Sequence, residues 1–221
     1  RPMMWGLGGA AAVCAAVLTA ISPAMVFYSR YYIQEMLLVC FTFGAIVSGY
    51  RYTQSRNIGW ALSAGVFLGL MHATKETCVI AFAAMLLALL LVLYIQRRQG
   101  PAQNAGKAIK RSHLIAGLAA AVTISALFFS SFLSNLPGIA DSVRTYTTYL
   151  DRAGSTPLHI HPWHYYLQML LYFRFGSGPV WTEAPIVILA LVGFVAVMTK
   201  KNWPGADRDL LQFIAFYTLV M

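Results

Sequence analysis

The chain has 221 residues, of which 59% are hydrophobic and only 10% are charged, and its mean hydropathy is +0.65. Soluble domains carry about 25% charged residues, so this chain has more apolar surface than a water-soluble core of its length could bury. The surplus is expected to face lipid. The composition therefore excludes an ordinary soluble domain and predicts an all-α, polytopic membrane protein.

Apolar windows with little or no charge predict about seven membrane-crossing segments, since a helix needs roughly 20 apolar residues to cross the hydrocarbon core. The first span is expected to end near Ile21, where Ser22 and Pro23 form an N-cap and a first-turn proline that start a new helix, which carries residues 28–35 to the outer interface. Because the chain starts with Arg1 and stops within an apolar stretch, we expect it to be a fragment of a longer protein. The windows are 3–29, 36–50, 57–74, 77–96, 112–140, 184–199 and 210–221.

The basic residues predict the orientation of these spans. If the chain starts inside, eleven of the sixteen Lys and Arg residues lie at Arg1 and in the inner loops, as is typical of cytoplasmic loops. The net charge of +9 is then a topology signal. The bases are scattered over helix ends and form no single stripe, so nucleic-acid binding is not indicated. One transmembrane domain is expected over 1–221, with cytoplasmic loops at 51–57, 96–112 and 199–209 and one outer loop at 134–183.

The outer loop is rich in Tyr, Trp, His and Pro. Its segment 163–175 is apolar and aromatic but too short to cross, which predicts an interfacial or re-entrant helix. His159, His161 and His164 stand close together, but the H-x-H-x-x-H spacing lacks the i, i+4 register of zinc hydrolases. The cluster is open to three interpretations: metal ligation, substrate binding with stacking by Trp163 and Tyr165, or a plain aromatic belt.

Arg30 and Glu35 lie five residues apart in an aromatic stretch that includes Tyr28. On a helix, five positions turn two side chains away from each other, so partners elsewhere are favoured over an intrahelical salt bridge. A guanidinium in this setting suits bidentate binding of a phosphate at the level of the lipid headgroups. The alternative is an interfacial anchor with a snorkelling arginine.

His72, Lys75 and Glu76 occupy positions i, i+3 and i+4 at the turn between two expected spans. On a continuing helix His72 would share a face with both of the others. This spacing suits a metal-ligand pair of His72 and Glu76, or a lysine that meets a phosphate. A solvated helix end with a local Lys and Glu pair is the alternative.

Other chemical patterns are weak. Cys14, Cys40 and Cys78 lie in or beside apolar segments without paired spacing, which is typical of small hydrophobic residues in a helix bundle. The sequence contains no G-x-S-x-G elbow, no P-loop and no Rossmann fingerprint. The candidate site residues described above all lie on the outer side of the predicted topology.

Three sequence motifs resemble those of one protein family and follow one another in the same order as in that family. They are SP-x4-YSR-x4-E at 22–35, H-x2-KE at 72–76 and HPWHYYLQMLLY at 161–172. Together they resemble the dolichyl-phosphate-mannose protein mannosyltransferases of the GT-C fold, in particular a prokaryotic branch labelled flippase-activity-associated. The resemblance covers most of the chain and implies a truncated GT-C-type helix bundle.

The resemblance implies a mannosyltransferase-like enzyme of protein glycosylation that moves a sugar from a polyprenyl-phosphate donor to a protein, lipid or glycan acceptor. The reaction would take place on the extracytoplasmic face of the plasma membrane, among its lipids. It also implies roles for individual residues. Arg30 and Lys75 would hold the donor phosphate, Glu35 and Glu76 would support them or a divalent ion, and Tyr28, His72, His161, Trp163, His164 and Tyr165 would line the substrate site.

Some features depart from the family pattern. The family's general base lies in an outer loop expected before Arg1, so the catalytic base cannot be named. Glu35 replaces the commoner Asp, and Arg174 stands where an acid is expected, which leaves the role of a metal open. The alternatives are a transporter or flippase of lipid-linked sugars and a non-catalytic assembly factor. The polar groups gather at one face, whereas carriers usually place their sites near the midplane, which favours the enzyme.

Overall fold

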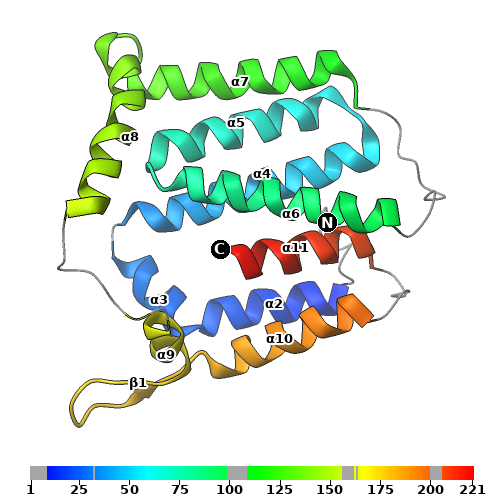
Figure 1. The fold of residues 1–221 in the computed structure, drawn as a ribbon, viewed down its shortest axis with the longest axis vertical. Helices are drawn as coiled ribbons and strands as arrows, with labels where there is room; N and C mark the ends of the chain where they lie inside the picture. The colour runs from blue at the N-terminus through cyan, green and yellow to red at the C-terminus, as the bar shows by residue number, and fades with distance from the viewer. Residues whose placement is uncertain (1–8, 32, 99–108, 156–161, 163, 200–205) are drawn as a thin grey trace. The chain divides into compact units, whose positions relative to one another are not determined.

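The structure is a computed structural model and describes residues 9–31, 33–98, 109–155, 162, 164–199 and 206–221. These residues are mostly helical, with one short antiparallel hairpin (Figure 1). The predicted helical class is therefore confirmed. The contacts divide the chain into two compact units, a central unit of residues 34–156 and a terminal unit of residues 3–33 and 157–220, which are described separately.

The central unit is built around α5, which packs against both α4 and α7. The α5 helix begins at Asn57, whose side chain caps it by accepting from the backbone N–H of Gly59. Small residues let α5 and α7 approach closely: a Cβ on Gly65 would overlap the carbonyl of Gly117, and one on Gly69 would lie 2.5 Å from the carbonyl oxygen of Ala121. The helices of this unit are α4 (Gln34–Ser55), α5 (Ile58–Thr74), α6 (Cys78–Arg98), α7 (Arg111–Phe129) and α8 (Pro137–Ser155).

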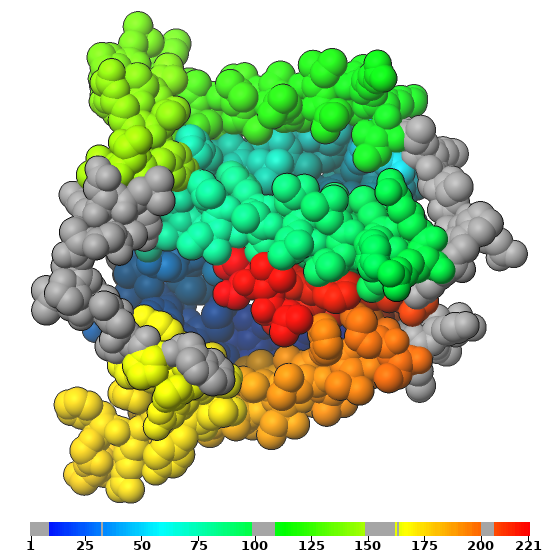
Figure 2. Space-filling view, in the orientation of Figure 1, coloured from blue at the N-terminus to red at the C-terminus, as the bar shows by residue number. Residues whose placement is uncertain are grey.

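The small core of the central unit lies where α4, α5 and α6 meet, with Met71 and Cys78 fully buried. Most other large apolar side chains point outward. Leu86 on α6 and Leu118 on α7, for example, are 58% and 65% exposed, as expected of helices whose partner is lipid. In the space-filling view the surfaces of α6 and α7 are uncovered on this face (Figure 2).

The α7 helix ends at Phe129, earlier than the apolar window 112–140 predicts. Three consecutive non-glycine residues, 131–133, then adopt positive φ angles of 48°, 58° and 72°, a region that side chains rarely enter. Ser130 holds this turn, because its buried hydroxyl accepts from the backbone N–H of Leu133 at 3.0 Å. The chain reverses into α8, an amphipathic helix that the sequence reading did not foresee.

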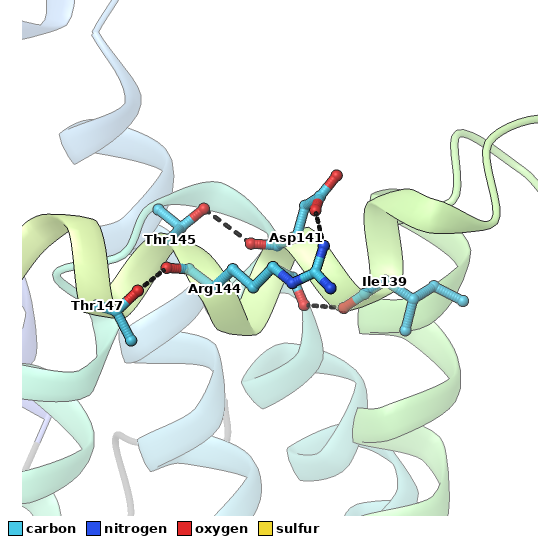
Figure 3. A network of polar contacts seen from close by, with 6 residues as sticks. Ile139, Asp141, Arg144, Thr145 and Thr147 are labelled. Carbon is cyan, nitrogen blue, oxygen red and sulfur yellow. Dashed lines mark hydrogen bonds and ion pairs between the residues drawn. The ribbon is translucent and has the colours of Figure 1, made fainter.

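The α8 helix carries a line of polar contacts along its exposed side (Figure 3). Arg144 forms an ion pair with Asp141 one turn earlier at 3.4 Å. The hydroxyls of Thr145 and Thr147 donate back to the carbonyls of Asp141 and Arg144. These bonds are local, so α8 has its own polar face, as an amphipathic helix requires.

The terminal unit begins with α2 (Gly9–Ile21) and α3 (Pro23–Arg30), which meet at an angle of 59°. The predicted start of a helix at Ser22 and Pro23 is confirmed: the Ser22 hydroxyl accepts from Met25 N–H at 3.2 Å, and Pro23 occupies the first turn. The new helix was expected to run on past residues 28–35 into the next membrane span, but it does not. It ends at Arg30, Tyr31 is extended, and α4 starts at Gln34.

The remainder of the terminal unit is α9 (Tyr165–Leu171), the hairpin of β1 (Phe173–Arg174) and β2 (Val180–Trp181), α10 (Ala184–Thr199) and α11 (Arg208–Val220). The predicted helix over 163–175 is therefore shorter than expected, because Tyr172 is extended and the next two residues pair with β2. The hairpin turns through Gly176, whose φ of +56° suits glycine. The α10 helix exposes Ile188, Leu191 and Val195 along its length (Figure 2, orange).

Within the described residues, α4, α6 and α7 are long and apolar enough to cross a membrane, and the bent pair of α2 and α3 counts as a fourth crossing if it is one span. The α5 and α10 helices are apolar but shorter. The chain is thus a mainly helical protein with several candidate membrane spans. The number of seven stays a prediction.

Candidate functional site

Lys75 and Glu35 form an ion pair that joins two predicted site residues from different helices. Glu35 lies in the first turn of α4, where its negative charge is favoured by the helix dipole, and Lys75 caps the C-terminus of α5, where a positive charge is favoured. The lysine side chain is 28% exposed and the glutamate side chain 50%. The pair therefore lies at a helix-end surface, where a further anion has access to the ammonium group.

His72, one turn before Lys75, is held between α7 and α8. Its Nδ1 lies 2.6 Å from the hydroxyl of Ser125 on α7. Its ring stacks on Tyr146 of α8, with centroids 6.1 Å apart and planes inclined by 21°, and it also contacts Phe129 at 5.1 Å. These contacts hold the half-buried ring of His72 between two aromatic rings, at the same helix end as Lys75.

Tyr146 extends this group of residues to α6. Its hydroxyl lies 3.7 Å from the sulfur of Cys78, the first residue of α6. Burial raises the pKa of the Tyr146 hydroxyl, and the hydrogen bond with Cys78 and the negative charge of Glu76 act in the same direction. Tyr146 therefore stays a neutral hydrogen-bonding group over the physiological pH range.

The spacing argument for a metal pair at His72 and Glu76 does not hold in the structure. The α5 helix ends at Thr74, and Lys75 is extended with φ −161° and ψ 145°, so Lys75 and Glu76 lie beyond the helix and do not share its face. Among the described residues there is no group of three or more His, Cys, Asp or Glu side chains placed to hold a metal ion.

The other predicted phosphate ligand, Arg30, belongs to the terminal unit and is the last residue of α3. Its side chain is exposed, and the guanidinium forms no ion pair with any residue that the structure describes. Tyr28 on the same short helix is also exposed and packs edge-on against Phe27 at 5.4 Å. The α3 helix thus ends in an exposed arginine that follows exposed aromatic side chains.

The predicted substrate residues of the outer loop are described only in part. His164 is the N-cap of α9, and Tyr165 is the first residue of that helix. Tyr165 packs edge-on against Tyr166 with ring centroids 5.3 Å apart. His161 and Trp163 lie outside the described residues.

The structure brings together Glu35 and Lys75, with His72 one turn away, and it places Arg30 and Tyr28 on one short helix. Sequence reasoning missed two side chains that contact His72, Ser125 and Tyr146. A helical period in 137–155 could have indicated Tyr146. Nothing local could have indicated Ser125, because it meets His72 only through the packing of α5 on α7.

The electrostatics favour an anionic ligand. The ammonium group of Lys75 in the central unit and the guanidinium of Arg30 in the terminal unit each lie at a helix terminus, and each can donate charge-assisted hydrogen bonds to an anion, which are about twice as strong as neutral ones. The flanking aromatic rings offer flat apolar faces of the kind that line sugar and isoprenoid sites.

Comparison with known proteins found one family. The sequence model of the dolichyl-phosphate-mannose-protein mannosyltransferases matches residues 6–128, which is more than half of the chain and includes Tyr28, Arg30, Glu35, His72, Lys75 and Glu76. No curated protein and no solved structure matches the chain. The resemblance first seen in three short strings is thus confirmed at the level of the family, and the chain belongs to the dolichyl-phosphate-mannose-protein mannosyltransferase family.

Proposed function

We propose that the chain is part of an integral membrane glycosyltransferase that transfers a sugar from a polyprenyl-phosphate donor to a protein, lipid or glycan acceptor on the extracytoplasmic face. Membership of the mannosyltransferase family supports the reaction class. The observation that carries the proposal is the placement of Lys75, which a carboxylate holds at an accessible helix end.

In this proposal, as the family resemblance implies, Arg30 and Lys75 are the cations that hold the donor phosphate. Lys75, oriented by Glu35, and Arg30, at the end of α3, stabilise the charge that develops on the phosphate as the bond from the anomeric carbon to the phosphate oxygen breaks. The acceptor hydroxyl oxygen forms the new bond to the anomeric carbon, and its proton passes to a general base that we do not assign. His72, Tyr28, His164 and Tyr165 contact the sugar, the acceptor or the first isoprene units.

The proposal is tested by sugar transfer in proteoliposomes that contain the full-length protein and a panel of radiolabelled polyprenyl-phosphate sugars. Arg30→Ala should lower turnover by about 100-fold or more, as removal of one electrostatic donor does in other enzymes. Arg30→Lys should keep part of the turnover, because the charge remains while bidentate geometry is lost.

The assay also separates the competing functions. If a lipid-linked sugar moved across the bilayer without being transferred to an acceptor, the result would favour a flippase over a glycosyltransferase. Wild-type turnover in Arg30→Ala would remove Arg30 from the donor site. In both cases, membrane insertion of the variant is measured alongside, since a surface arginine at a helix end contributes little to folding.

A further inference from the structure

The start of α3 is held by a residue from the far end of the sequence. The Glu183 carboxylate accepts a hydrogen bond from the hydroxyl of Ser22 at 2.7 Å and another from the backbone N–H of Ala24 at 2.8 Å. Ser22 is 4% exposed and Glu183 is 9% exposed. A buried carboxylate that keeps its hydrogen bonds is costly to disturb.

These bonds complete the N-terminus of α3. The first turn of a helix leaves N–H groups without intrahelical partners. Pro23 has no N–H, Glu183 accepts from Ala24, Ser22 accepts from Met25, and Val26 donates to the carbonyl of Ser22. The negative charge of Glu183 also lies at the positive end of the helix dipole. The direction in which α3 leaves the bend is therefore set by Glu183.

Glu183 is itself fixed by its backbone. Its N–H donates to the carbonyl of Leu170 in α9 at 2.8 Å, and its carbonyl accepts from Ile186 and Val187 in the first turn of α10. The neighbouring Thr182 hydroxyl donates to Leu171 and accepts from Ala184. One residue thus ties α3, which carries Tyr28 and Arg30, to α9, which begins at His164 and Tyr165.

We propose that Glu183 is a positioning residue for the donor-phosphate site: its carboxylate fixes α3 against the start of α10 and so places Arg30 relative to the outer-loop residues of α9. The proposal rests on the function proposed above for Arg30. In this proposal Glu183 acts on the reaction through the position of α3, whose first turn its carboxylate bonds.

The test compares Glu183→Ala and Glu183→Gln in the full-length protein. The control is Asp207→Ala, which removes a carboxylate that accepts from Asp209 N–H and Leu210 N–H at the start of α11 and thus costs a helix cap without touching α3. Hydrogen exchange of the peptide over 22–31 reports on α3 directly, and donor-dependent transfer gives kcat and KM.

In Glu183→Ala we expect faster exchange at Ala24 and Met25 and a loss of roughly tenfold to 100-fold in kcat/KM, the size of effect that small misplacements of a catalytic group produce. Glu183→Gln should keep most of both, because its amide oxygen still accepts both hydrogen bonds. In an Arg30→Lys background, Glu183→Ala should cost less than in the wild type, since both changes act through one group.

The proposal is overturned if Glu183→Ala leaves the exchange of α3 unchanged, or if Asp207→Ala costs as much transfer as Glu183→Ala. It is also overturned if Glu183→Gln loses transfer while α3 stays protected. Should Glu183→Ala fail to fold, Ser22→Ala takes its place, because it removes the hydroxyl that donates to Glu183, and Glu183→Gln remains the conservative comparison. If the wild type transfers no sugar, the proposed function fails, while the exchange measurement still decides whether Glu183 holds α3.

Discussion

At the scale of single residues, Lys75 and Glu35 illustrate how an ion pair can matter for function more than for stability. Both side chains are partly exposed, and such pairs contribute only about 0–1 kcal/mol to folding. The pair fixes the position of the ammonium group and leaves it open to solvent. Its value to the protein is therefore expected to lie in how a phosphate is held.

A charge swap separates these two roles. Glu35→Lys combined with Lys75→Glu retains an ion pair but sets each charge against the dipole of its helix, so the protein should still fold, at a cost in stability of about 1–2 kcal/mol. Sugar transfer should fall by about 100-fold, because a carboxylate would now stand beside the donor phosphate. Wild-type transfer in the swapped protein, measured in proteoliposomes, would mean that the pair only supports the structure.

Tyr146 is expected to make the stability of the folded protein fall at high pH. Its pKa in the folded protein is raised above the unfolded value of about 10, first by burial and then by the hydrogen bond with Cys78. The stability that its neutral form contributes is fully present below about pH 10 and is lost as the pH rises toward the folded pKa. The melting temperature should therefore fall above about pH 10, and it should fall less in Tyr146→Phe, as melting curves between pH 8 and 11 would reveal. Equal slopes in the two proteins would remove Tyr146 as the cause.

At the scale of helices, the close contact between α5 and α7 places the site. Gly65 and Gly69 let α5 approach the α7 backbone, and this approach brings His72 to Ser125. A larger side chain at either glycine must push the two helices apart. The position of His72 is thus determined by two glycines that lie within about two turns of it on the same helix.

Gly65→Leu should destabilise the protein by about 1–3 kcal/mol, the usual cost of overpacking, and should reduce transfer because His72 and Lys75 shift. Gly49→Leu on α4 is the matched control, because a Cβ at Gly49 meets no atom within 4 Å. Thermal unfolding and transfer of the two variants are compared. Similar losses in both would mean that leucine at any helix glycine is harmful.

The helices also show which features could be predicted from the sequence. Ser22 and Pro23 marked the start of α3 correctly, because capping depends on adjacent residues. The end of α3 at Arg30 and the end of α7 at Phe129 were missed, because neither break has a proline or glycine at the position where the helix stops. Glu35 was expected to find a partner away from Arg30, and it does so in Lys75, but the partner itself depends on how α4 and α5 pack.

At the scale of the whole molecule, the distribution of charge predicts orientation. The loop that contains Ser55 is expected inside, and α8 is expected outside. After replacement of Cys14, Cys40 and Cys78, Asp141→Cys should react with a membrane-impermeant maleimide in intact cells, since Asp141 is exposed. Ser55→Cys should react only after permeabilisation. The reverse pattern would invert the topology and remove the proposed site from the outer face.

The bond between Ser22 and Glu183 also orders the events of biosynthesis. The two residues are 161 positions apart, so at about 5–20 residues per second the ribosome needs roughly 8–30 s to supply Glu183 after Ser22 has been made. During that interval the Ala24 N–H has no carboxylate to bond, and the bend between α2 and α3 has not been fixed. The nascent chain therefore acquires the final position of α3 late, once the start of α10 has been made, and a chain truncated before Glu183 should insert its early helices without the bond that fixes the bend.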